Sequence, residues 1–264
     1  MVLFPSFSRS TNGGETYRGT ADAVYKNLAL IERHSPSMVA VFAADQVYRM
    51  DVRQMVMFHR ECDADATVAA TRVPLANASS FGIIAAGARG EICDFQEKPE
   101  WPDAIPACPE QAYASMGSYL FNTDVLVESL ERALREGATD FGKNILPSLI
   151  RSRHVYAYDF AGNRVPGIGS HEEQAYWRDE GTLEAYASAY QDVVGTAPRF
   201  NLHNLYWPLL PSRFSLPCMS AVSNSSCANG KPRSPGSQPY WNLGAFSAER
   251  EHPQFGKSWQ MGNA

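Results

Sequence analysis

The sequence predicts an α/β fold, and two observations carry that prediction. Apolar runs alternate with helical patterns over residues 17–210, as they do in chains that combine a sheet with covering helices. Hydrophobic residues make up 44% of the 264 residues and charged residues 19%, which excludes wholesale disorder. The length allows one large domain, or one domain with an appendage.

Helices are expected where a capping residue precedes apolar residues at helical spacing. Three are expected: one that Thr20 caps and Pro36 ends, one that Asn122 or Thr123 caps and Gly137 ends, and one from Thr182 to about Val194. In the second of these, Leu126, Leu130 and Leu134 form one apolar stripe. A further helix is expected to begin near Met50.

Strands are expected where short apolar runs are bounded by turn residues. They are predicted at residues 38–44, 66–73, 81–86, 91–95, 113–121 and 154–160. The run Met38–Ala44 is continuously apolar, which is typical of a strand covered on both faces. The strands over 81–86 and 91–95 are expected to form a hairpin about residues 87–90.

The two ends of the chain differ in composition from its middle. Residues 1–16 are polar and are expected to form an irregular lead-in. In residues 211–264, Ser, Pro and Gly account for 21 of the 54 positions. A segment of that composition buries little apolar surface, so residues 211–264 are expected to be disordered or unrelated to the rest.

Charge, hydropathy and cysteine usage exclude several classes of protein. The net charge of −5 argues against a generally basic nucleic-acid binder. The longest apolar run, Met38–Ala44, is too short to cross a bilayer, and the first ten residues have no secretory pattern. The odd number of cysteines and the absence of C-x-x-C favour reduced thiols. We therefore expect a cytoplasmic protein that binds neither nucleic acid nor membrane.

Two carboxylates stand where a metal ion could bind. Asp45 follows an apolar run, at the strand end where open α/β sheets bind ligands, and would be poorly solvated there. Mg²⁺ prefers one or two carboxylates together with substrate phosphates. Asp179 precedes a glycine turn and could be a second ligand. The alternatives are that Asp45 caps the helix near Met50 and that Asp179 interacts with a helix dipole.

Lys98 is a candidate for binding a phosphate or a carboxylate. It lies between Glu97 and Pro99, and the proline is expected to hold Lys98 in an extended conformation. The alternative is an ordinary surface lysine.

Seven blocks in a fixed order give the resemblance that decides among these alternatives. They are Tyr17-Arg18-Gly19-Thr20-Ala21-Asp22-Ala23-Val24, Ala43-Ala44-Asp45-Gln46-Val47-Tyr48-Arg49-Met50-Asp51, Phe81-Gly82, Glu97-Lys98-Pro99, Ala114-Ser115-Met116-Gly117, Asp140-Phe141-Gly142-Lys143 and Tyr176-Trp177-Arg178-Asp179. In this order they resemble the glucose-1-phosphate adenylyltransferases, over roughly residues 17–210.

The resemblance implies a Rossmann-like, GT-A-like mixed sheet and a transfer reaction. The phosphate of glucose 1-phosphate attacks the α-phosphorus of ATP, and ADP-glucose and pyrophosphate form, for glycogen or starch synthesis. By similarity Asp45, Lys98 and Asp179 are catalytic, and Asp45 and Asp179 hold Mg²⁺. Lys98 contacts the sugar phosphate and Glu97 the sugar hydroxyls. The other positions that match the family's binding residues are Tyr17, Gly82 and Ser115.

The 264 residues also depart from the family pattern. The family's first strand and its G-G-x-G-x-R-L phosphate loop are absent, as are the hexapeptide repeats of its C-terminal β-helix. Gln46 replaces a usual His, and Glu180 a usual Val. We expect this chain by itself to have weak activity or none. A non-catalytic sugar-phosphate binder, a remnant that pairs with another subunit, and an enzyme using another nucleotide remain as alternatives. The family forms homo-oligomers.

Overall fold

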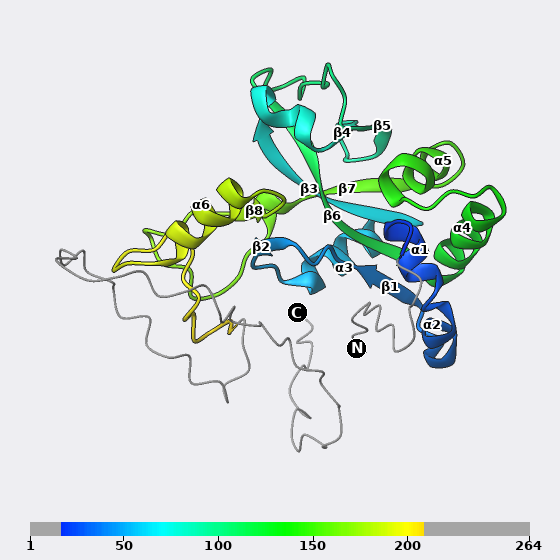
Figure 1. Ribbon diagram of the computed structural model, residues 1–264, viewed down its shortest axis with the longest axis horizontal. Coiled ribbons are helices and arrows are strands. Elements are labelled where there is room, and N and C mark those ends of the chain that lie inside the picture. Colours follow the sequence, from blue (N-terminus) through cyan, green and yellow to red (C-terminus); the bar gives the residue numbers. More distant parts are fainter. Residues whose placement is uncertain (1–16, 209–264) are drawn as a thin grey trace, which may run out of the picture. The chain divides into compact units, whose positions relative to one another are not determined.

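The computed structural model describes residues 17–208, which fall within one compact unit (Figure 1). The expected lead-in over 1–16 and the expected tail over 211–264 lie outside the described residues.

A mixed sheet forms the centre of the fold, with strand order β5-β4-β6-β3-β7 and with β1 also paired to β6. Its strands are β1 (Met38–Val41), β3 (Ala66–Pro74), β4 (Gly82–Ala86), β5 (Ile92–Glu97), β6 (Gln111–Asn122) and β7 (Val155–Asp159). The β3–β7 pair is parallel and the other pairs are antiparallel. A second, two-stranded sheet joins β2 (Gln46–Tyr48) to β8 (Trp177–Asp179). The expectation of an α/β fold with a mixed sheet is confirmed.

Helices cover the central sheet. They are α1 (Thr20–Tyr25), α2 (Leu28–His34), α3 (Val52–Glu61), α4 (Thr123–Arg135), α5 (Leu146–Ile150) and α6 (Leu183–Val193). Shorter turns are the 3₁₀ segments η1 (Leu75–Ser80) and η3 (Phe160–Gly162) and the π-helical turn η2 (Phe141–Ile145). In Figure 1, α4 and α5 lie beside α1 at one end of the sheet, and α6 lies at the other end beside β8.

Two buried clusters of apolar side chains pack on opposite faces of the sheet. Strand β3 shows the alternation, because Val68 and Ala70 belong to one cluster and Ala69 and Val73 to the other. The first cluster includes side chains from α4, η2 and α5, and the second includes side chains from α3, η1 and β8. Both faces of the sheet are therefore packed against apolar side chains.

The longest strand, β6, contains an irregularity that bears on the site. Val68 of β3 pairs with Tyr119, and Ala70 pairs with Ser115, so two steps along β3 correspond to four along β6. Gly117, which lies among the extra residues of β6, has a positive φ of 63°. This β-bulge displaces the backbone between Ser115 and Tyr119 from the regular ladder, a feature often found next to active sites.

The helix expected from Thr20 to Pro36 is interrupted. It is split into α1 and α2 at Lys26 and Asn27, where the side-chain amide of Asn27 donates to the Ala23 carbonyl oxygen at 2.8 Å. The expected N-cap is also wrong, because Gly19 occupies that position and no side chain caps α1. The hydroxyl of Thr20 is used elsewhere, in contacts with Asp140 and η2.

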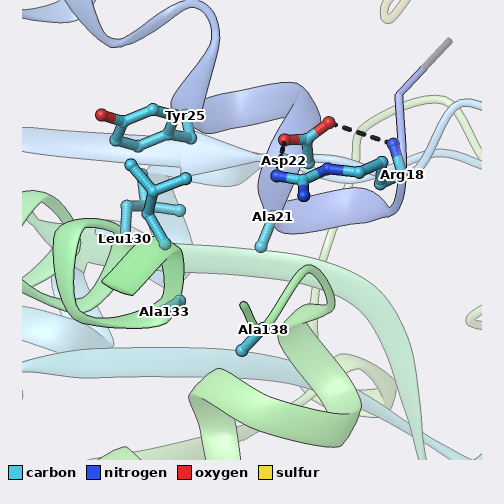
Figure 2. Close-up of a pocket in the computed structure, with 8 residues that line it drawn as sticks. Arg18, Ala21, Asp22, Tyr25, Leu130, Ala133 and Ala138 are labelled. Atoms are coloured by element: carbon cyan, nitrogen blue, oxygen red, sulfur yellow. Dashed lines mark hydrogen bonds and ion pairs between the residues drawn. The ribbon is translucent and has the colours of Figure 1, made fainter. Parts of the chain in front are cut away.

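The contact of α1 with the rest of the fold begins at its first turn. The backbone amides of Ala21 and Asp22 donate to the Thr139 carbonyl oxygen at 2.9 and 3.3 Å. Asp22 accepts hydrogen bonds from Arg18, and Ala21 and Leu130 both line a small cavity between α1 and α4 (Figure 2). The cavity between α1 and α4 measures about 10 Å³, close to the minimum for one water, so it is no ligand site.

The strand expected over Met38–Ala44 is shorter and less covered than its composition indicates. It ends at Val41, the side chain of Ala40 is exposed, and Phe42 is 36% exposed. The cause is position, since β1 pairs with β6 on one side and no strand within residues 17–208 pairs with its other side. The expected covering on both faces is therefore wrong.

The other predicted elements agree with the structure except in details. The hairpin of β4 and β5 is confirmed, and Thr182 caps α6 by accepting from the Ala185 amide. Gly137 has a φ of 70°, which ends α4 as expected. Within the expected leucine stripe, however, Leu134 is 41% exposed, because it lies at the last turn of α4.

Two expectations from composition can be compared with residues 17–208. Each cysteine in that range, namely Cys62, Cys93 and Cys108, is a free thiol, whereas Cys218 and Cys227 lie outside it. No helix within the range has the length and apolarity that crossing a lipid bilayer requires.

Candidate active site

The two candidate metal ligands lie close together. In the β2–β8 sheet Gln46 pairs with Asp179, and the Glu180 amide donates to the Asp45 carbonyl oxygen at 3.0 Å. The backbone thus brings Asp45 beside Asp179. The alternative that Asp45 caps the helix near Met50 is wrong, since the side chain of Asp51 caps α3.

A third carboxylate stands next to this pair. The pKa of Glu180 is raised by burial and by the negative charges of Asp45 and Asp179. Asp45 itself is exposed, so the expectation that its carboxylate is poorly solvated is wrong. Within residues 17–208 no group of three or more His, Cys, Asp or Glu could hold a metal ion by itself. A cation at this position would need substrate phosphates as ligands in addition to the two carboxylates.

An aromatic side chain joins the two strands beside the carboxylate pair. The Trp177 indole nitrogen donates to the Gln46 side-chain oxygen at 3.1 Å. The Trp177 ring packs edge-on against Phe81, with ring centroids 5.4 Å apart. Gln46, which replaces the family's usual His, therefore joins β2 to β8 as a neutral hydrogen-bond acceptor.

A second cluster forms around Glu97. Gly82 of β4 pairs with Glu97 of β5, and a Cβ on Gly82 would lie 3.1 Å from a Glu97 carboxylate oxygen. Burial and the charge of Asp140 raise the pKa of Glu97, whereas Lys98 and Lys143 act in the opposite direction. Glu97, Lys98 and Gly82 thus form one group, together with the turn that begins at Asp140.

The backbone of Lys98 is not extended as expected. Its φ is 49°, in the left-handed region that residues with side chains seldom adopt. The Lys98 amide donates to the Phe81 carbonyl oxygen at 3.1 Å, and this long-range bond overrides the local preference that Pro99 imposes. A backbone held in such a conformation fixes where the side chain starts, and strain of this kind gathers at functional sites.

The bulge of β6 places Ser115 near the Glu97 group. The Ser115 hydroxyl accepts from the Gly117 amide at 3.2 Å. Burial raises the pKa of Tyr119 to about 12, with smaller contributions from Asp140 and Glu97. A Cβ on Gly117 would lie 3.2 Å from the Ala43 Cβ, close to Asp45. The bulge therefore lies between the carboxylate pair and the Glu97 group.

Tyr17 lies at the edge of this arrangement. Its hydroxyl accepts from the Asn27 side chain at 3.4 Å, and the Lys26 ammonium lies 5.6 Å from its ring centroid. These contacts belong to its own stretch of chain and do not connect Tyr17 with Asp45, Asp179 or Glu97.

A cleft of about 710 Å³ opens beside β8, but it does not coincide with the Glu97 group. Asp179 and Trp177 line it, whereas Glu97 and Lys98 do not. Its arginines are already ion-paired, Arg72 with Asp159 and Arg178 with Glu173, each at 2.7 Å. Because its cations are neutralised, this cleft suits a phosphate less well than the Lys98 neighbourhood does.

Comparison with known proteins shows the family of the chain. Residues 7–195 match the nucleotidyl transferase family. The chain belongs to that family. Within this nucleotidyl transferase, the match takes in both clusters described above.

Several relatives of known name are similar to this chain. The chain is 47% identical over 223 residues to a glucose-1-phosphate adenylyltransferase of Thermodesulfovibrio yellowstonii, covering 83% of this chain and 54% of the relative. It is 47% identical to that of Thermus thermophilus, covering 73% and 47%, and 44% identical to one of Vibrio cholerae, covering 75% and 49%. The chain spans about half the length of the curated relatives it matches.

Sequence reasoning did not assign roles to three residues that the structure places at the site. Gly117, Tyr119 and Gly142 lie within or beside the blocks that carry the resemblance, but their contacts join segments far apart in the chain. For Gly117 and Gly142 the available signal was the residue type, because glycine marks close approach of the backbone to another group.

Proposed function

We propose that the protein acts in adenylyl transfer from ATP to glucose 1-phosphate, giving ADP-glucose and pyrophosphate. The observation that carries the proposal is the juxtaposition of Asp45 and Asp179 through the β2–β8 pairing. The family match and the names of the relatives support the reaction and its substrates.

The residues present fit a divalent cation, for which Mg²⁺ is the proposed identity. Asp45 and Asp179 would hold it, because hard oxygen ligands are what Mg²⁺ prefers. When bound, the ion would neutralise charge on the substrate phosphates.

The other site residues would position the sugar phosphate. Lys98 would pair with the phosphate of glucose 1-phosphate, and Glu97 would accept hydrogen bonds from sugar hydroxyls. Gly82 leaves room beside Glu97, and Ser115 offers a hydroxyl from the bulge. Tyr17 would bind substrate from the segment before α1. Phosphoryl-type transfers depend mostly on such positioning and on charge stabilisation.

A second candidate function is binding of glucose 1-phosphate without transfer. The observation that favours it is that Glu97 and Lys98, which would bind the sugar phosphate, do not line the cleft that Asp179 lines. A cytoplasmic location and a homo-oligomeric assembly complete the proposal.

The test is calorimetric titration of the 264-residue chain with glucose 1-phosphate, with and without Mg²⁺, followed by pyrophosphate release on adding ATP. We expect Mg²⁺-dependent binding, which Asp45→Asn abolishes and the exposed Asp63→Asn leaves unchanged. Pyrophosphate release above the Asp45→Asn background supports transfer, and a panel of UTP and dTTP tests the nucleotide. Binding without release favours the second candidate. Failure to bind glucose 1-phosphate contradicts both.

A further inference from the structure

The carboxylate of Glu97 occupies the space that a side chain on Gly142 would fill. A Cβ built on Gly142 would lie 2.6 Å from a Glu97 carboxylate oxygen and 3.3 Å from the Cδ that bears it. The first distance is far below van der Waals contact. Gly142 is buried, and its φ lies outside the left-handed region. Its glycine identity is thus explained by this contact and not by backbone strain.

The turn that carries Gly142 is fixed on several sides. Phe141 is 1% exposed, and its ring lies 5.3 Å from the ring centroid of Tyr119. The Asp140 carboxylate accepts from the Lys143 amide at 2.9 Å. Thr20 accepts from the Phe141 amide at 3.1 Å. In this contact the turn is the rigid partner, and the end of the flexible Glu97 side chain is the movable one.

We propose that Gly142 is a positioning residue, whose missing side chain fixes the Glu97 carboxylate against the Asp140–Lys143 turn. Alanine at this position would push the carboxylate away from the turn and leave the backbone in place. The consequence for glucose 1-phosphate rests on the proposed function, whereas the position of the carboxylate does not.

The experiment compares Gly142→Ala with Gly162→Ala in the full 264-residue chain. Gly162 is exposed, a methyl group added to it would have no atom within 4 Å, and its φ is not positive, so it is a matched control. Three quantities are measured: the pKa of the Glu97 carboxyl by NMR titration, the Kd for glucose 1-phosphate by calorimetry, and the Tm.

For Gly142→Ala we expect the Glu97 pKa to fall towards the ordinary value, because the displaced carboxylate leaves its buried place. We expect the Kd for glucose 1-phosphate to rise about tenfold, the scale of one hydrogen bond to a charged group. The Tm should stay near that of Gly162→Ala, since the atom displaced is the end of a flexible side chain.

A double-mutant cycle separates positioning from a general structural effect. In a Glu97→Gln background, Gly142→Ala should raise the Kd for glucose 1-phosphate by less than the tenfold expected of Gly142→Ala by itself. The reason is that both changes act through the same carboxylate. Full additivity, or an unchanged Glu97 pKa in Gly142→Ala, would overturn the proposal. If the unaltered chain fails to bind glucose 1-phosphate, the proposed function is contradicted, and the Glu97 titration still decides the role of Gly142.

Discussion

The indole of Trp177 donates to the side-chain oxygen of Gln46, and this bond crosses the small sheet beside which Asp45 and Asp179 meet. The two strands come from distant parts of the chain. Their pairing, and not either strand separately, creates the arrangement of carboxylates. The site therefore depends on tertiary structure before any substrate arrives.

Glu180 should destabilise the protein as the pH rises. Its folded pKa is raised, first by burial and then by Asp45 and Asp179, so its proton favours folding below the ordinary glutamate pKa. That contribution is lost as the pH rises through the folded pKa. Glu180→Gln should then be more stable than the unaltered chain at pH 7, by less than about 1 kcal/mol, with the difference vanishing near pH 4. Urea unfolding at several pH values measures this, with exposed Glu136→Gln as the control.

A stability difference between Glu180→Gln and the unaltered chain that does not change with pH would contradict a raised pKa for Glu180.

The buried ion pair of Arg49 and Glu172 should be sensitive to loss of one partner. Their side chains are 3% and 2% exposed, and the Glu172 carboxylate also accepts from the amides of Gly169 and Asn201 at 2.7 and 2.8 Å. Glu172→Gln leaves the guanidinium without its counter-charge, and we expect a cost of about 3–5 kcal/mol. Chemical denaturation measures this.

The same pair offers an internal control. Replacing Arg49 as well, as in Arg49→Met with Glu172→Gln, should cost less than Glu172→Gln, because no buried charge remains and the glutamine oxygen still accepts a backbone amide hydrogen bond. If the single and double variants lose the same free energy of unfolding, the shape of the side chains, and not their charge, determines the stability at this position.

Gly117 should not tolerate a side chain. Its φ of 63° disfavours alanine, and the new Cβ would lie 3.2 Å from that of Ala43. We expect Gly117→Ala to lower the free energy of unfolding by about 1–2 kcal/mol. Urea unfolding beside Gly162→Ala measures the difference. If the two variants are equally stable, the bulge is more adaptable than its geometry indicates.

The open side of β1 should promote association. Within residues 17–208 no strand pairs with that side, and Ala40 and Phe42 expose apolar surface there. We expect the purified chain to self-associate at micromolar concentration, and Ala40→Lys to reduce this, because an edge lysine opposes strand pairing. Light scattering after size-exclusion chromatography gives the mass. A monodisperse monomer that melts cooperatively would refute the prediction.

Local patterns predicted the parts of the fold that depend on neighbouring residues. The hairpin of β4 and β5, the cap at Thr182 and the helix end at Gly137 each rest on a few consecutive residues, and each was found. The closeness of Asp45 and Asp179 was implied by family resemblance, and the β2–β8 pairing supplies the geometry.

The misses share a physical cause, which is a contact between distant segments. The positive φ of Lys98 accompanies a hydrogen bond to Phe81, and the hydroxyl of Thr20 contacts Asp140 in place of capping its helix. The half-exposure of β1 reflects its place at the edge of the sheet. Composition and periodicity carry no information about such partners, so these features needed the three-dimensional arrangement.

The capping of α1 by the Thr139 carbonyl has a consequence for the order in which the chain folds. A six-residue helix is not stable by itself, because too few bonds offset the cost of nucleation. The amides of Ala21 and Asp22 find their acceptor only after the long loop between them and Thr139 has closed, which carries an entropic cost. Helix α1 is thus a late-forming element, and hydrogen exchange at these two amides reports whether the whole domain has closed.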